Sequence, residues 1–127
     1  MAARNRRVVL AREDPLAGLT DNKIKKAYRF TRAGVLYLAD MLQDDLEPRN
    51  QRNSPLSPLM QLCITLMYFA GGSLLYQIAR AHRVSSASVS RSIRKVTLAL
   101  VRRRSEVGNL FHIFIHFPSY SLIYKLA

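Results

Sequence analysis

The sequence has 127 residues, 49% of them hydrophobic, which is enough for one compact domain and too little for two. Twenty Lys and Arg against eight Asp and Glu give a net charge of +12, which excludes an electrically neutral surface and makes a polyanion the expected partner. A single cysteine, Cys63, excludes a disulfide scaffold and a zinc module built on several cysteines.

The excess positive charge lies in two parts of the chain. Residues 1–12 contain four Arg and no acid, and the stretch from Arg80 to Arg104 contains no carboxylate. Residues 1–18 are predicted to form a flexible basic arm that ends at Pro15 and Gly18. The arm contains Arg4, Arg6 and Arg7. These cations are expected to add salt-dependent affinity for a nucleic acid without sequence preference.

Apolar residues at helical spacing predict an all-α fold, a small bundle of about five helices over residues 19–106. Each expected helix begins at a residue suited to cap it: Asp21, Thr31, Ser57 followed by Pro58, Ser73, and Ser85 or Ser86. The expected ends lie close to Arg29, Leu46, Ala70, His82 and Glu106. The third helix is apolar nearly all round, so we expect it at the centre of the bundle.

The last segment, 107–127, is predicted to be an apolar tail. Large apolar residues alternate from Phe111 to Phe117, as in a β-strand, although one strand without partners is not stable. The uncharged stretches 53–79 and 107–124 are interrupted by proline, glycine or histidine, and neither offers the roughly 20 apolar residues in a row that a bilayer requires. We therefore expect a soluble intracellular protein without a membrane partner.

Residues 75–93 have the features of a helix-turn-helix unit, which we place within 74–106. Small Ala79 permits a close crossing of two helices, Val84 plugs the turn, and the space between the helices is filled by Ile78, Val89 and Ile93. The turn residue before the valine is usually glycine, and here it is Arg83. Because a left-handed turn costs a non-glycine residue about 1 kcal/mol or more, a turn that is one residue longer or differently wound is expected.

The second helix of this unit, about Ser85–Arg104, is predicted to enter the major groove of DNA. A stripe of Val89, Ile93, Val96 and Leu100 opposes a cationic side formed by Arg91, Arg94, Lys95 and Arg102. Base contacts are expected from Ser86, Ala87 and Arg91, and a bidentate contact of Arg91 with guanine is worth about 1–3 kcal/mol. Backbone contacts are expected from Arg83, Ser85, Ser88, Ser90, Arg94, Lys95, Arg102, Arg103 and Arg104.

Other candidate sites have weaker support. His112 and His116 lie four residues apart, but the surrounding pattern is that of a strand and no third ligand is near, so no metal site is predicted. The acidic group Asp40, Asp44, Asp45 and Glu47 is interpreted as a solvated helix end rather than a cation site. Cys63 has no activating partner and is expected to be a buried thiol. No catalytic residue is predicted.

Beyond the two-helix unit, the run from Tyr28 to about Pro118 resembles the N-terminal region of the PIF/Harbinger transposase family, which includes the harbinger transposase-derived nucleases. The matching pieces are Tyr28–Arg32, Leu36–Leu46 with Glu47 and Pro48, Ser57 and Pro58, Phe69–Ser73, Val84–Arg91, Val96–Val101 and Phe114–Pro118. The resemblance implies a helical accessory domain with a helix-turn-helix, followed by a metal-dependent nuclease of RNase H-like fold. Glu106 is the only acid after Glu47, so we expect the family's catalytic positions to be absent and 107–127 to be a truncated start of the nuclease domain.

The expected function is therefore a DNA-binding module that is not an enzyme, with double-stranded DNA as partner and no cofactor. A divalent metal is implied only for the full-length family. One alternative is a protein-interaction domain, because the resemblance implies a separate Myb-like DNA-binding partner. Another is a truncated member of a nuclease family. The expected location is the nucleus, with the cytoplasm as a second compartment.

Overall fold

A computed structural model describes residues 14–48, 55–71, 74–103 and 105 of the chain. Within these residues the fold is all-α and contains no strand, so the predicted fold class is confirmed. The helices are α2 (Asp21–Tyr28), α3 (Arg32–Met41), α4 (Gln43–Leu46), α5 (Pro58–Gly71), α6 (Leu75–His82) and α7 (Ser86–Arg102). The arm cations Arg4, Arg6 and Arg7, the alternating stretch 111–117 with its two histidines, and Arg104 lie outside the described residues.

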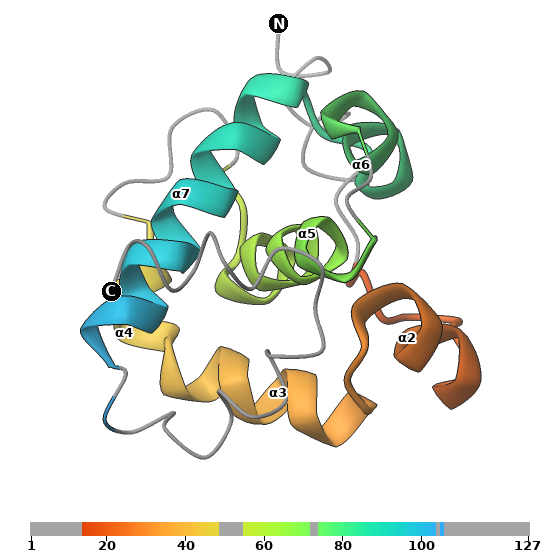
Figure 1. The fold of residues 1–127 in the computed structure, drawn as a ribbon, viewed down its shortest axis with the longest axis horizontal. Coiled ribbons are helices and arrows are strands. Elements are labelled where there is room, and N and C mark those ends of the chain that lie inside the picture. Colours follow the sequence, from red (N-terminus) through yellow and green to blue (C-terminus); the bar gives the residue numbers. More distant parts are fainter. Residues whose placement is uncertain (1–13, 49–54, 72–73, 104, 106–127) are drawn as a thin grey trace, which may run out of the picture.

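Helix α5 lies at the centre of the bundle and contacts each of the other helices (Figure 1). Ten of its fourteen residues are buried, as its apolar character on all sides predicts. The side-chain oxygen of Ser57 accepts a hydrogen bond from the N–H of Met60 at 3.1 Å, and Pro58 occupies the first helical position. The predicted start of this helix is therefore confirmed.

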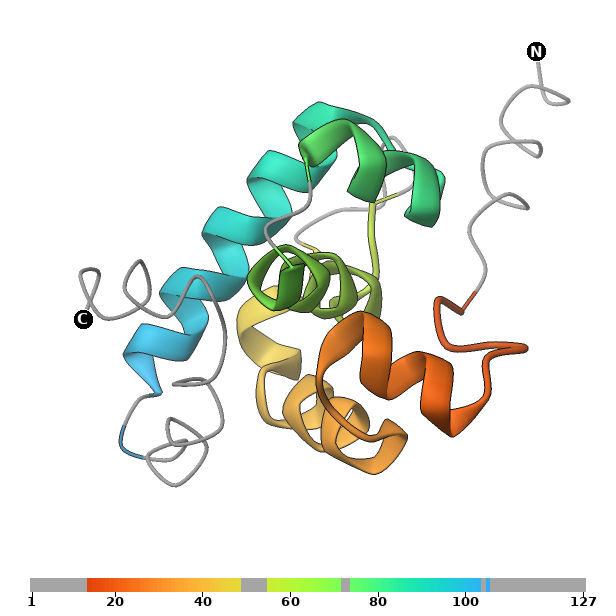
Figure 2. The ribbon, with the colours of Figure 1, turned by 45° about the vertical axis from the view of Figure 1, so that its right-hand side comes forward.

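Two groups of buried apolar residues surround α5. The larger group packs α2, α3, α4 and the second half of α7 against it, and Leu38, Leu66 and Phe69 are among its fully buried members. The smaller group holds α6 and the start of α7, and it consists of Met60, Ile64, Ile78, Ala79 and Val89. Figure 2 shows α6 and the first turns of α7 together at one end of the molecule, with α2 and α3 at the other end. The end formed by α6 and the first turns of α7 is therefore held to the bundle by the smaller group of buried residues.

The N-terminal helices differ from the prediction in detail. The N-cap of α2 is Thr20 rather than Asp21, because the Thr20 hydroxyl accepts the N–H of Lys23 at 3.3 Å. The predicted helix 31–46 is capped by Thr31 as expected, but Leu42, at φ −95° and ψ 5°, divides it into α3 and α4. The N–H of Leu42 still donates to Leu38 at 3.0 Å, so the division is a local bend within one helical path.

Three predicted boundaries also move. The arm was expected to extend to Gly18, but residues 14–18 form a turn whose Leu16 is only 1% exposed, so they are packed on the domain. Helix α6 begins after Leu74 in the N-cap position, while the expected cap Ser73 lies outside the described residues. Helix α7 ends at Arg102 rather than near Glu106, because the backbone of Arg103 leaves the helical conformation at φ −105° and ψ 24°.

Candidate nucleic-acid interface

Helices α6 and α7 are joined by a short turn in which Arg83 has the left-handed conformation, with φ 57° and ψ 44°. The N–H of Val84 donates to the carbonyl of Ala79 at 3.0 Å, and the N–H of Arg83 donates to that of Arg80 at 3.3 Å. These two bonds form the Schellman arrangement that usually ends a helix at glycine. The expected longer or differently wound turn is therefore wrong: arginine adopts the glycine conformation, and half-buried Val84 packs against the small core group.

Replacing Arg83 by glycine is expected to raise the free energy of unfolding by up to about 1 kcal/mol, because glycine adopts this conformation without the steric strain of a Cβ. Urea denaturation of Arg83→Gly beside the unchanged chain measures the difference. Arg83→Ala is the control, since it removes the same cation and keeps the Cβ. Equal stability of the two variants would contradict the presence of strain at this position.

The start of α7 is organised by a chain of polar side chains. The Ser85 side-chain oxygen accepts the N–H of Ser88 at 3.1 Å, which makes Ser85 the N-cap residue. The two serine hydroxyls are 3.0 Å apart, and the Arg91 guanidinium donates to the Ser88 hydroxyl at 3.2 Å. The exposed Arg91 is therefore directed back towards the first turn of the helix, where a recognition helix carries its base-contacting residues.

The two sides of α7 are those that the sequence predicts. Val89, Val96 and Leu100 are buried and Ile93 is half-buried. All three predicted base-contacting residues are exposed, as are most of the predicted backbone-contacting ones: Arg83, Ser85, Ser90, Arg94, Lys95 and Arg102. Helices α5, α6 and α7 contain no carboxylate, so this exposed side is cationic and rich in hydroxyl groups.

Two of the predicted backbone-contacting residues are engaged with α4 instead of extending freely into solvent. The Arg103 guanidinium forms an ion pair with the Asp45 carboxylate at 2.5 Å. The Lys95 ammonium donates to the carbonyl of Leu46 at 3.4 Å. Ser88 is half-buried, and its hydroxyl already contacts Ser85 and Arg91.

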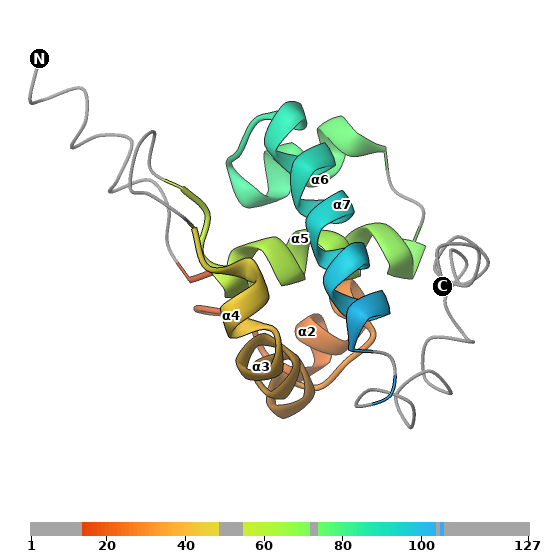
Figure 3. The same ribbon diagram turned by 90° about the vertical axis from the view of Figure 1, so that its left-hand side faces the viewer.

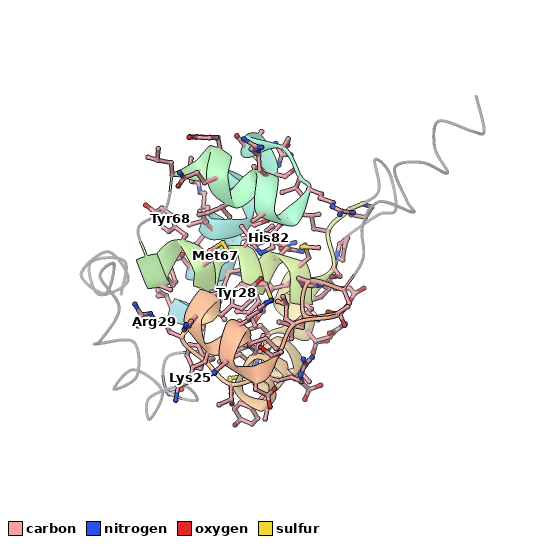
Figure 4. All side chains as sticks on the ribbon, turned by 90° about the vertical axis from the view of Figure 1, so that its right-hand side faces the viewer. Lys25, Tyr28, Arg29, Met67, Tyr68 and His82 are labelled. Carbon is pink, nitrogen blue, oxygen red and sulfur yellow. The ribbon has the colours of Figure 1, made fainter. Side chains whose placement is uncertain are left out.

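A buried polar pair that the sequence analysis did not find joins α2 to α6. The His82 Nδ1–H donates to the carbonyl of Ile78 at 2.9 Å, and its Nε2 accepts from the Tyr28 hydroxyl at 3.0 Å. Figure 4 shows the pair where α2, α5 and α6 meet. Burial lowers the pKa of His82, so the ring is neutral at pH 7 and adds no charge to the interface. The position of His82 four residues after Ile78, on the apolar side of α6, is the sequence signal from which its burial could have been predicted.

An apolar groove lies beside the exposed side of α7. It has a volume of about 390 Å³ and is lined by Tyr68, Leu75, Ser90, Ile93, Arg94, Thr97 and Leu98. Two large apolar side chains that line it are exposed, Leu75 at 37% and Leu98 at 39%. An exposed apolar surface of this kind is typical of a contact site for another molecule.

Cys63 is fully buried in α5, as predicted, and burial raises the pKa of its thiol to about 12. Among the residues that the structure describes, no group of three or more His, Cys, Asp or Glu side chains is placed to hold a metal ion. Nor does that part of the chain contain a helix with the length and apolar character needed to cross a membrane.

Known proteins of similar sequence include two named "Putative nuclease HARBI1", from Rattus norvegicus and Bos taurus. Each is 35% identical to this chain over 104 residues, which are 82% of the chain and 28% of the relative. Over 82% of its length the chain is therefore related in sequence to the Harbinger transposase-derived HARBI1 proteins. The HARBI1 protein of Homo sapiens is 34% identical, also over 104 residues. No family model and no solved structure matches the chain.

The HARBI1 match confirms the family that the sequence pieces indicated. The chain spans 28% of the length of these HARBI1 relatives, so the nuclease activity in their name is a statement about much longer proteins. The role of α6 and α7 in this chain is therefore argued from its own geometry.

Proposed function

We propose that α6 and α7 form a helix-turn-helix that binds double-stranded DNA, with the start of α7 in the major groove. The observation that carries the proposal is the exposed side of α7, where Arg91 and Arg94 lie among small and hydroxyl side chains on a surface without carboxylates. Figure 2 supports access by a duplex, because this part of α7 lies at an end of the molecule. Phosphates attract the cations, and the small side chains allow close approach to base edges.

In this proposal Ser86, Ala87 and Arg91 face the bases. Ser85, Ser88, Ser90, Arg83 and Arg94 position the helix on phosphates and sugars. In this proposal α6 and α7 bind DNA and take no part in cutting it, since neither helix contains a carboxylate that could hold a metal ion. The chain's place of action is the nucleus, where duplex DNA is present.

The test measures binding of a mixed-sequence duplex by fluorescence anisotropy over a series of salt concentrations. Arg94→Gln is expected to weaken binding several-fold at low salt and to reduce the slope of log K against log salt by about 1, because one phosphate contact is lost. Lys26→Gln is the matched control, since Lys26 is an exposed cation on α2 and its loss changes the net charge by the same amount.

The DNA affinities of the two variants decide whether α7 contacts DNA. A larger effect of Arg94→Gln than of Lys26→Gln supports contact between α7 and DNA. Equal effects would show that only the total charge of the chain attracts DNA, and the proposed interface would be wrong. Absence of binding at moderate salt would also reject it.

The apolar groove supports a second candidate function, a protein-interaction domain that binds a Myb-like partner. A partner helix seated between Leu75 and Leu98 would cover their exposed apolar surface. Leu98→Asp separates the two functions, because a charge in the groove opposes binding of an apolar helix. Loss of partner binding with DNA binding retained would assign the groove to the protein partner. Retained binding of the partner would reject the groove as its docking site.

A further inference from the structure

The cations of α7 fall into two groups with different surroundings. Arg91 and Arg94 lie on its first half, and neither forms an ion pair with any of the described residues. Lys95, Arg102 and Arg103 lie further along, on the side that faces α4. Figure 3 shows α7 crossing α5, with α6 near its first turns and α4 to one side.

Two carboxylates of α4 and that of its C-cap residue, Glu47, lie beside the second group. A cavity of about 360 Å³ between the helices is lined by Asp44, Asp45, Glu47, Lys95, Leu98, Ala99 and Arg102. The bonds from Arg103 to Asp45 and from Lys95 to the Leu46 carbonyl cross the same boundary. We name Asp44, Asp45 and Glu47 the acidic edge.

The acidic edge has a direct consequence for a bound duplex. Ser86 and Arg94 are separated by about 12 Å along the helix axis, which is about the width of the major groove. A phosphate beside Arg102 would lie a further turn or two along α7 and would face the carboxylates of the acidic edge. The carboxylates there repel a phosphate, and one of the cations, Arg103, is already paired with Asp45.

We propose that the acidic edge confines DNA to the first half of α7 and so limits binding that does not depend on sequence. This inference rests on the proposed function, because it concerns the extent of the same interface. Fewer phosphate contacts lower the affinity for any duplex and leave a larger share of the binding free energy to base contacts. The predicted backbone contacts of Lys95, Arg102 and Arg103 are therefore absent or weak in the complex.

The experiment neutralises one carboxylate of the edge. Asp44 is exposed and lines the cavity, so Asp44→Asn removes a charge without removing the Asp45–Arg103 ion pair. Affinity for a mixed-sequence duplex at low salt is expected to rise roughly threefold, with a salt slope steeper by up to about 1 as a cation of α7 reaches a phosphate. Asp21→Asn, on α2, is the control with the same change in net charge.

Arg94→Gln and Lys26→Gln, measured in the same series, keep this inference separable from the proposed function. Tighter binding by Asp44→Asn than by Asp21→Asn supports the acidic edge. Equal tightening by both, or no change in Asp44→Asn while Arg94→Gln loses affinity, would overturn the inference and leave the proposed function standing. Equal affinities of Arg94→Gln and Lys26→Gln would overturn both. Thermal unfolding of each variant verifies that it is folded.

Discussion

Replacing Arg91 by alanine is expected to weaken binding to a preferred DNA site by about 1–3 kcal/mol, or roughly 5- to 150-fold. The reason lies in its position: Arg91 is exposed on the early turns of α7, and Ser88 holds its guanidinium towards the helix start. A bidentate contact with guanine would be lost together with its charge. The preferred site is first selected from random duplexes with the unchanged protein, and its affinity for each variant is then measured.

Arg102→Ala is the matched control for this prediction. It removes an equal charge from the same helix, but at the acidic edge, so its effect on affinity is expected to be small and independent of sequence. Specific reading of a base by Arg91 requires a greater loss on the selected site than on an unselected duplex. The same loss on both would assign Arg91 to a phosphate and remove the base contact from the proposal.

Local spacing was sufficient to predict the elements of this fold and the sides of its longest helix. The 3.6-residue period alone determines that Val89, Val96 and Leu100 share a buried stripe while Arg91 and Arg94 lie outside it. The caps at Thr31, Ser57 and Ser85 were also predictable, because a hydroxyl at a helix start satisfies backbone N–H groups a few residues away. Both signals, the helical period and the capping hydroxyl, depend only on residues that lie close together in the sequence.

The features that were missed depend on distant parts of the chain. Arg103 pairs with Asp45, 58 residues away, and Tyr28 bonds to His82 at a separation of 54 residues. Spacing along the sequence contains no information on which residues meet once helices pack. Arg83 is a different case: its left-handed conformation opposes its own preference, and the packing of Val84 with two backbone bonds overrides that preference.

The two groups of buried residues stabilise the proposed interface and the rest of the bundle to different extents. Leu38, Leu66 and Phe69 belong to a large group that ties together most of the helices, whereas α6 and the start of α7 rest on a few residues around Ile78. Local opening requires less free energy where fewer apolar contacts must be broken. The orientation of α6 relative to α7 is therefore more sensitive to changes in the core than the bundle as a whole.

Ile78→Ala is expected to lower the free energy of unfolding by about 2–5 kcal/mol, because it leaves a cavity in this small group. Ile78 is fully buried between α6, α5 and α7, and its carbonyl also accepts the His82 ring N–H. Hydrogen exchange of the α6 amides is expected to accelerate more than that of α5, and DNA affinity to fall as the turn loses its fixed geometry. Urea denaturation, hydrogen exchange and anisotropy measure the three effects.

Leu38→Ala is the control, since it removes the same number of carbon atoms from a fully buried site in the larger group. Leu38→Ala is expected to lower the free energy of unfolding by a similar amount. It is expected to leave DNA affinity unchanged under conditions where the chain stays folded. If Ile78→Ala fails to fold, Ile78→Val, with an expected cost of about 0.5–1.5 kcal/mol, gives the same comparison at smaller amplitude. Equal effects on DNA affinity from both core groups would show that the bundle opens as one unit, because α6 would then have no weaker support than the other helices.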